Sequence, residues 1–313
     1  MTGLKYFDLH CDTISECHDR SQGLRHNDLH WSLERAGIFR PMAQVFAIFI
    51  RDNLRGEDAL ARFDTLYDTF ETQMRQNADS VFFCRSRDEL EQAFASGKTA
   101  ALLSIEGGAA LGGKMENLER TYQKGVRILT LTWNGHCELG DGVGVPDAVG
   151  LTPFGRDVVH RMEELGMTVD VSHLSEAGFW DVAEISTRPF IASHSDAKAV
   201  CAHRRNLTDR QFDEIRRRGG LVGINLYRNF LKDGGDGASM TDILRHMEYF
   251  LTRGGEEVLA IGGDLDGSDL PDGFAGVQDL GRVYEEMLRH YPQKTVDAIF
   301  FDNAARFLRQ ALR

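Results

Sequence analysis

This sequence of 313 residues is poor in basic side chains and has no long apolar run. It carries 36 lysines and arginines against 48 aspartates and glutamates, which gives a formal net charge of -12. Nucleic acids and anionic membranes attract basic surfaces, so neither is expected as a partner. No stretch approaches the ~20 apolar residues of a membrane span, and the N-terminus does not have the pattern of a signal peptide. We therefore expect no membrane anchor.

Cysteine is also scarce, with five residues and no CxxC pair. An odd number of scattered cysteines does not predict a disulfide framework, and the cytoplasm is the expected location. Cys11, Cys137 and Cys201 stand in no motif that would activate a thiol. Buried packing is therefore the expectation for these side chains.

The chain does have a regular alternation of strand-like and helix-like segments, without a break in composition. This order predicts an α/β fold, a single (β/α)8 TIM barrel over residues 1–313. Apolar residues at spacings of three and four predict a helix over 57–76, and Thr208 with Gln211 forms a capping-box pattern before another helix. The expected barrel strands are residues 4–9, 43–50, 99–105, 126–132, 167–172, 189–193, 221–226 and 258–262.

Residues that can bind metals stand at the ends of five of these strands. They are His10 and Asp12 after the first strand, Glu106 after the third, His173 after the fifth, His194 after the sixth and Asp264 after the eighth. A single histidine at a strand end is usually structural, but barrel closure brings all strand ends to one mouth. Three imidazoles and three carboxylates suffice for two divalent ions that share a bridging carboxylate.

Two other patterns are less informative. The segment 25–30 contains a second His-x-Asp, His26-Asn27-Asp28, but it follows Ser-Gln-Gly rather than an apolar strand, so we expect a polar loop. The segment from Asp264 to Gly267 resembles the start of a calcium loop. Its sixth and twelfth positions hold Asp269 and Ala275 instead of the glycine and the acid that an EF-hand needs.

With these residues in view, the sequence resembles the membrane (renal) dipeptidase family, peptidase family M19, whose members are zinc peptidases with an amidohydrolase-type barrel. The resemblance covers nearly the whole chain. It is carried by Leu-His-Cys-Asp-Thr at 9–13, Ser-Ile-Glu-Gly-Gly at 104–108, Asp-Val-Ser-His at 170–173, Ala-Ser-His-Ser at 192–195, Arg-Arg-Asn at 204–206 and Ile-Gly-Gly-Asp-Leu-Asp-Gly at 261–267.

This resemblance implies two zinc ions per chain, bridged by Glu106 and a hydroxide. His10 and Asp12 would bind one zinc ion, and His173 and His194 would bind the other. The implied activity is the hydrolysis of dipeptides, including those with a C-terminal D-residue. Metal ions suit this chemistry, because they lower the pKa of bound water from 15.7 to roughly 7.

By the same resemblance, Asp264 is the catalytic base and acid, which takes the proton of the hydroxide and passes it to the leaving amine. Arg205 would hold the terminal carboxylate of the substrate. A planar guanidinium suits this role because it can bind both carboxylate oxygens.

One position departs from the family pattern. The family places a substrate-binding histidine just after the fourth strand, where this chain has Trp133-Asn134-Gly135-His136. Either His136 bends back into the site, or Trp133 offers its indole N–H, or Trp133 only packs there. We therefore take both as candidate substrate-binding residues.

Two alternatives to a dinuclear zinc dipeptidase remain open. Trp133 favours a related amidohydrolase acting on N-acyl amino acids, lactones or phosphoesters, although Arg205 favours a substrate with a free carboxylate. An inactive metal-binding scaffold is the alternative of another class. Iron, cobalt or manganese also fit histidine and carboxylate ligands. The expected partner is a small dipeptide, and the sequence leaves room for a homodimer.

Overall fold

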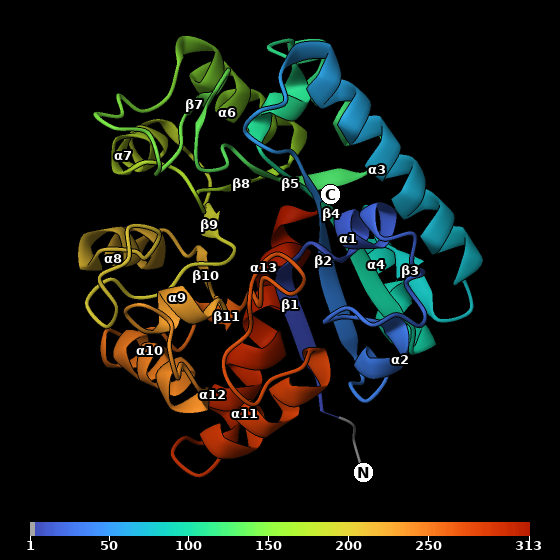
Figure 1. Ribbon diagram of the computed structural model, residues 1–313, viewed down its shortest axis with the longest axis vertical. Coiled ribbons are helices and arrows are strands. Elements are labelled where there is room, and N and C mark those ends of the chain that lie inside the picture. The colour runs from blue at the N-terminus through green and yellow to red at the C-terminus, as the bar shows by residue number, and fades with distance from the viewer. Residues whose placement is uncertain (1–3) are drawn as a thin grey trace.

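The computed structural model describes residues 4–313, so the first three residues of the predicted 1–313 domain lie outside the described part. Parallel strands close into a barrel in the middle of the molecule, and helices surround it (Figure 1). This arrangement confirms the predicted (β/α)8 barrel. Its strands are β1 (Tyr6–Cys11), β2 (Met42–Phe49), β4 (Thr99–Glu106), β5 (Val126–Thr130), β8 (Thr168–Asp170), β9 (Ile191–Ala192), β10 (Leu221–Ile224) and β11 (Leu259–Ile261).

The order of strands around the barrel follows the order along the chain. Each strand pairs in parallel with the next of the eight, and β11 pairs back with β1. Three short strands lie outside this ring. They are β3 (Val81–Phe83), which pairs with the start of β4, and the antiparallel hairpin of β6 (His136–Cys137) and β7 (Gly140–Asp141).

The helices lie on the outside of the barrel and in its connections. They are α1 (Thr13–Asp19), α2 (Leu33–Ala36), α3 (Gly56–Gln76), α4 (Arg87–Ser96), α5 (Met115–Gln123), α6 (Pro153–Leu165), α7 (Glu176–Ile185), α8 (Asp209–Arg217), α9 (Arg228–Leu231), α10 (Met240–Thr252), α11 (Leu280–Met287), α12 (Gln293–Asp297) and α13 (Asn303–Ala311), with short turns η1 (Gly108–Leu111), η2 (Val277–Asp279) and η3 (Ala298–Asp302). The predicted capping box of Thr208 and Gln211 is present at the start of α8. Over residues 4–313, no helix combines the length and the apolar character that crossing a membrane requires.

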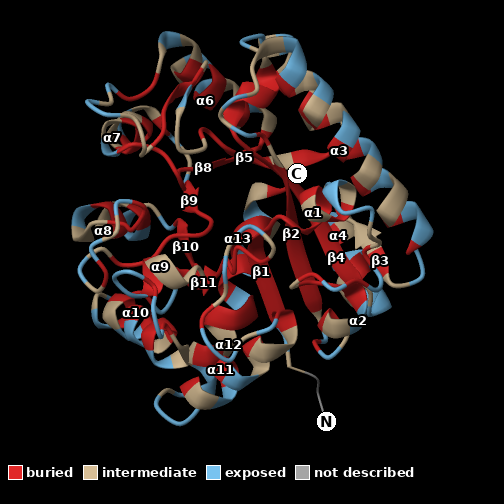
Figure 2. Ribbon diagram, viewed as in Figure 1, coloured by how far each residue is buried: buried red, intermediate tan, exposed pale blue. Residues whose placement is uncertain are grey.

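The barrel is filled by apolar side chains from nearly every strand. One buried cluster unites residues of seven barrel strands with α13, among them Phe7, Val45, Leu102, Ile191 and Leu308. A larger cluster fills the space between the strands and the surrounding helices. In Figure 2 the strands are almost wholly buried, whereas exposed residues lie on the outer helices and loops. The polar strand ends are thus held on a rigid, close-packed support.

A β-bulge re-aims the end of β1. Asp8 pairs with Gln44 and Cys11 pairs with Phe46, so β1 has one more residue than β2 between these pairs. Leu9 belongs to the cluster inside the barrel, whereas Cys11 belongs to the outer cluster. The extra residue lets His10 face the barrel axis directly after Leu9, because a bulge reverses the alternation of side chains along a strand.

Candidate metal centre

The six strand-end residues meet at the carboxyl end of the barrel. All six are buried, with at most 9% of each residue exposed. Ligand atoms lie within 4.8 Å of one another in two overlapping groups, one of His10, Glu106 and His194 and one of His10, Asp12 and Asp264. The strand ends therefore converge as the sequence predicts.

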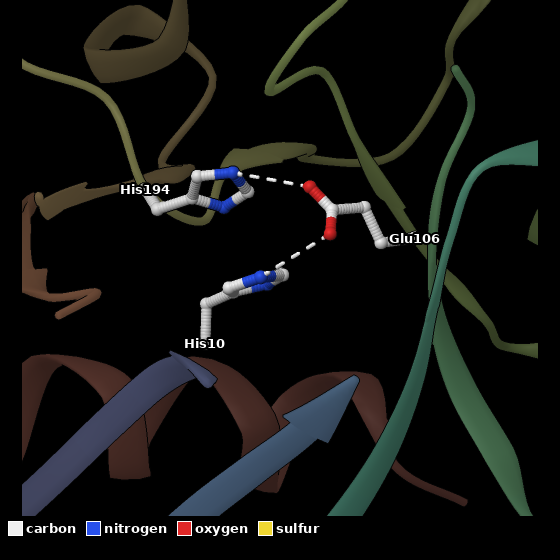
Figure 3. A group of neighbouring side chains, drawn as sticks. All are labelled: His10, Glu106 and His194. Carbon is white, nitrogen blue, oxygen red and sulfur yellow. Dashed lines mark ion pairs between the residues drawn. The ribbon is translucent and has the colours of Figure 1, made fainter. Parts of the chain in front are cut away.

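Glu106 lies between the imidazoles, and its two oxygens face different ones (Figure 3). Oε1 lies 2.8 Å from Nε2 of His173 and 3.5 Å from Nε2 of His194. Oε2 lies 3.6 Å from Nε2 of His10. A carboxylate that divides its oxygens in this way has the geometry of a bridge between two neighbouring ligand groups.

The second group lies on the β1 side of the cluster. Nε2 of His10 is 3.4 Å from Oδ2 of Asp12 and 3.8 Å from Oδ1 of Asp264. Within the first group, the rings of His10 and His194 are only 4.0 Å apart between centroids. The two groups overlap, because His10 belongs to both of them.

Three buried polar atoms of the cluster have no hydrogen-bond partner within residues 4–313. They are Nε2 of His10, Nε2 of His194 and Oδ1 of Asp12. An unpartnered buried polar atom costs about 1–3 kcal/mol, so native proteins rarely keep several together without a ligand. Imidazole nitrogens and carboxylate oxygens are suitable ligands for a divalent transition metal. The residues therefore fit a metal centre.

Burial and neighbouring charges shift the pKa values of the three carboxylates of the cluster in different directions. Burial raises the pKa of Asp264 to about 7, and burial together with the charge of Glu106 raises the pKa of Asp12 to about 6. Burial opposes ionisation of Glu106 as well, but His10 and His173 hold its pKa well below its ordinary value. Of the three carboxylates in the cluster, Glu106 is therefore the one that ionises most readily when no metal is bound.

Two buried aspartates hold the strand ends in place. Asp8 accepts hydrogen bonds from the backbone N–H groups of His10 (3.0 Å) and Gly263 (2.9 Å), and so joins β1 to β11. Asp170 does the same between β8 and β9, through the backbone N–H groups of Ser172 (3.0 Å) and Ser193 (2.9 Å). The supporting role of these two residues was not predicted from the sequence. Its signal is an acid inside an apolar run, two or three positions before a candidate ligand histidine.

The Nδ1 atoms of two candidate ligand histidines also have hydrogen-bond partners. Nδ1 of His194 lies 2.7 Å from Oγ of Ser193, and Nδ1 of His173 lies 3.0 Å from Oδ1 of Asn134. Such bonds orient an imidazole and present Nε2 to the metal. His173 and Asp264 have positive φ angles of 66° and 53°. Strained backbone of this kind is tolerated where a functional side chain must be aimed.

Asn225, at the end of β10, holds the carboxylate of Asp264. Its Nδ2 donates to Oδ2 of Asp264 over 3.2 Å, and its Oδ1 accepts from the backbone N–H of Tyr227 over 2.6 Å. The backbone N–H of Asn225 donates to Oδ1 of Asp196. Oδ2 of Asp264 is therefore occupied, while its Oδ1 faces His10.

Four residues of the cluster line a cavity of about 570 Å³, namely Asp12, Glu106, His173 and Asp264. Trp133 lines this cavity, and its ring packs edge-on against Phe49 with 5.0 Å between centroids. His30 also lines it, and Nδ1 of His30 accepts a hydrogen bond from the backbone N–H of Asp266. The segment 25–30 is a loop, as predicted, but it contributes a cavity residue that the sequence analysis set aside.

His136 lies apart from the cluster. Its exposed side chain is in the β6–β7 hairpin, where Nδ1 is 2.6 Å from Oδ1 of Asp141. It does not line the 570 Å³ cavity. Trp133 and His136, three residues apart in the sequence, thus have different surroundings, because the chain turns into the hairpin between them.

Arg205 lies beside the cluster and lines a second cavity, of about 210 Å³, with His173 in the shared wall. Only 6% of Arg205 is exposed, and its Nε has no hydrogen-bond partner among the described residues. Its Nη2 donates to the backbone oxygen of His194 over 3.3 Å. Burial lowers the pKa of Arg205 to about 10, so the guanidinium is still charged at neutral pH.

Comparison with known families agrees with this geometry. The sequence matches the family described as membrane dipeptidase (peptidase family M19) over residues 1–313. The chain belongs to the membrane dipeptidase family. Membership of this family, together with the solved structures described next, supports a metal-dependent dipeptidase.

Similar proteins include members of the M19 family with solved structures. Dipeptidase AC, a metallopeptidase of family M19, is 28% identical with a TM-score of 0.92, covering 99% of both chains. A metallopeptidase from Rhodobacter sphaeroides, solved with a phosphinate mimic of the dipeptide L-Ala-D-Ala, is 27% identical with a TM-score of 0.91, covering 99% of this chain and 100% of that chain. An uncharacterized protein in the pqqA 5' region of Klebsiella pneumoniae is 36% identical over 243 residues, which are 74% of this chain and 90% of that protein.

Proposed function

We propose that this chain is a dinuclear zinc dipeptidase that accepts dipeptides, including those with a C-terminal D-residue. The observation that carries the dinuclear assignment is the division of the Glu106 carboxylate, with Oε1 toward His173 and His194 and Oε2 toward His10. The similar metallopeptidase that was solved with a mimic of L-Ala-D-Ala supports the choice of substrate.

Five residues would hold the metal ions. His10 and Asp12 would bind one ion, His173 and His194 would bind the other, and Glu106 would bridge them. When bound, the ions would polarise the scissile carbonyl and lower the pKa of a water molecule toward neutrality. Zinc suits this mixed histidine and carboxylate set, although related divalent metals compete for such ligands.

Asp264 would move the proton during hydrolysis. Its Oδ2 is held by Asn225, so Oδ1, which faces His10, is the oxygen available to accept a proton from the attacking water. The oxygen of that water bonds to the carbonyl carbon as the peptide C–N bond breaks. Asp264 then gives the proton to the leaving amine nitrogen, so that one carboxylate serves as base and acid.

Substrate binding would use the walls on both sides of the cluster. Arg205 is buried, charged and has an unpartnered Nε, which suits a substrate carboxylate. Of the two candidates after the fourth strand, the geometry favours Trp133, because it lines the large cavity and His136 does not. Trp133 would bound the space for the substrate, with its ring fixed against Phe49.

The decisive experiment combines metal analysis with substrate screening. We expect about two zinc ions per chain in purified protein, loss of turnover on chelation and recovery with zinc. A library of dipeptides with L- and D-residues at the C-terminus should contain substrates, and the same assay should include N-acyl amino acids and lactones. Metal-replete protein that hydrolyses N-acyl amino acids or lactones but no dipeptide would replace this proposal with the amidohydrolase alternative.

A further inference from the structure

The 210 Å³ cavity beside the metal centre has a charge opposite to that of the whole chain. Three cationic residues line it, namely Lys198, Arg204 and Arg205, and one acidic residue, Glu176. The chain as a whole carries a formal net charge of -12. A local excess of positive charge on so acidic a protein indicates a preference for an anionic ligand.

No direct ion pair holds these cations. None of Lys198, Arg204 and Arg205 has a carboxylate oxygen within 4.0 Å among residues 4–313, although the buried acids of the metal centre lie near enough to Arg205 to favour its charged form. The densest basic run in the sequence behaves differently, since Arg216, Arg217 and Arg218 each pair with an acid on α8. The cations around the small cavity are therefore available to a ligand.

The depth of the cavity adds a second, independent observation. Arg205 is almost fully buried, and its Nε has no hydrogen-bond partner in the described chain. Burying a guanidinium that lacks a full set of partners is costly, so the free donor indicates a ligand atom. Lys198 is half-buried, and Arg204 is exposed at the rim. Positive charge thus extends from the wall shared with the metal centre to the surface.

One carboxylate does not account for three cations. Under the function proposed above, Arg205 binds the terminal carboxylate of the dipeptide, which leaves Lys198 and Arg204 without a ligand. The cavity has room for more than a carboxylate, and His173 connects its wall to the metal centre. The group that lies next to the terminal carboxylate in a dipeptide is the side chain of the C-terminal residue.

We propose that the 210 Å³ cavity is a binding subsite for an acidic side chain on the C-terminal residue of the dipeptide. Lys198 is the main specificity-determining residue, and Arg204 at the rim adds to the attraction. Glu176 opposes it, because this acid lines the same cavity. The inference rests on the proposed dipeptidase function and adds the substrate class to it.

The test compares two dipeptides that differ in charge and hardly in shape, alanyl-glutamate and alanyl-glutamine, each with an L- or D-residue at the C-terminus. We expect kcat/KM for the glutamate member to exceed that for the glutamine member by roughly three- to tenfold at low salt. The ratio should fall toward one as the salt concentration rises, because the half-buried and exposed cations are screened.

Three variants make the comparison specific. Lys198→Met should lower the glutamate-to-glutamine ratio to near one, because kcat/KM falls much more for alanyl-glutamate than for alanyl-glutamine. Glu176→Gln should raise the same ratio by about twofold, because it removes the opposing charge. Lys294→Met is the matched control, since this exposed lysine on α12 lines neither cavity and should leave the ratio unchanged.

The outcomes separate this inference from the proposed function. Hydrolysis of both dipeptides with a ratio near one in the unmodified protein would overturn the subsite and leave the dipeptidase standing. Equal losses on both dipeptides in Lys198→Met, with unchanged metal content, would make Lys198 a structural residue and also overturn it. Failure to hydrolyse any dipeptide would refute the proposed function, and the subsite with it.

Discussion

The two cavities that share His173 have opposite charges. The larger one adjoins the candidate metal centre. The acids that line it are Asp12, Glu16, Asp19, Glu106, Asp264, Asp266 and Asp269. Its two arginines are paired, Arg20 with Glu16 and Arg51 with Asp19. The smaller cavity has three cations without ion-pair partners in the described chain and one acid.

This difference suits a substrate that carries both charges. A dipeptide has a positive amino group at one end and a negative carboxylate at the other. Under the proposed function, the acidic cavity would favour the amino end and Arg205 the carboxylate end, so that the fields of the two cavities would orient the scissile bond between them. The net charge of the sequence does not reveal this, because it sums over regions that act separately.

The largest expected effect comes from replacing Asp264, the proposed proton carrier in the acidic cavity. Asp264→Asn should lower kcat by roughly 10²–10⁴-fold, because the amide cannot accept and return the proton. Metal content should stay near two ions per chain, since Asp264 is not among the proposed ligands. Steady-state kinetics and metal analysis would measure both quantities.

The control for Asp264→Asn is Asp269→Asn, which removes an acid that lines the same cavity. We expect it to change kcat by less than about threefold, because no hydrogen bond or ion pair involves its side chain within residues 4–313. Full activity of Asp264→Asn would refute the mechanism. Equal losses of kcat in the two variants would mean that Asp264 contributes only its negative charge to the cavity and does not transfer the proton.

The next largest effect is expected on the cationic side. Arg205→Met should lower kcat/KM roughly 10- to 100-fold, mainly through KM, because a charged hydrogen-bonded pair with the substrate is lost. The loss should be absent for dipeptide amides, which have no terminal carboxylate. Arg205→Lys should recover part of the loss, since it keeps the charge without the planar fork. Equal losses on dipeptides and their amides would contradict carboxylate binding.

A smaller effect is expected for Asn225, a neutral residue that positions Asp264. Asn225→Ala should lower kcat about tenfold with little change in KM or metal content, because Oδ2 of Asp264 loses its donor. Asn225→Ser keeps a polar group, so its kcat should lie between those of the unmodified protein and Asn225→Ala. A thermal unfolding curve should accompany the kinetics. A lower Tm with unchanged kcat would mean that Asn225 acts only in folding.

The smallest effect is expected at His136, which lies outside both cavities. His136→Ala should change kcat/KM by less than about twofold and lower the free energy of unfolding by no more than ~1 kcal/mol, as expected for an exposed ion pair with Asp141. Trp133→Ala should reduce kcat/KM more strongly, since Trp133 lines the cavity. A larger loss in His136→Ala than in Trp133→Ala would reverse the preference stated above.

Much of the fold and most of the candidate ligands can be predicted from short segments of the sequence. Each barrel strand is a short apolar run, and each ligand candidate lies at the end of such a run or within three positions after it. The rule that strand ends meet at one mouth of a barrel then places His10, Glu106 and His194 together without further knowledge. The structure brings them to one cluster.

The supporting residues could not be predicted in the same way, because their partners are distant in the sequence. Asp8 binds a backbone N–H that is 255 positions away, and the bond between His30 and Asp266 spans 236 positions. No local pattern encodes such pairs. The bulge in β1 is also invisible in the sequence, since it appears only as a shift in the pairing with β2.

The sequence by itself determined the barrel, the residue types at its strand ends and therefore the class of metal chemistry, because periodicity and strand boundaries are short-range properties of the chain. Only the tertiary structure decided which oxygen of Glu106 faces which histidine, that Trp133 and not His136 lines the cavity, and that an acidic protein has a cationic cavity beside its metal centre. Those features depend on contacts between side chains from separate loops. Barrel closure and loop packing determine which of these side chains come into contact.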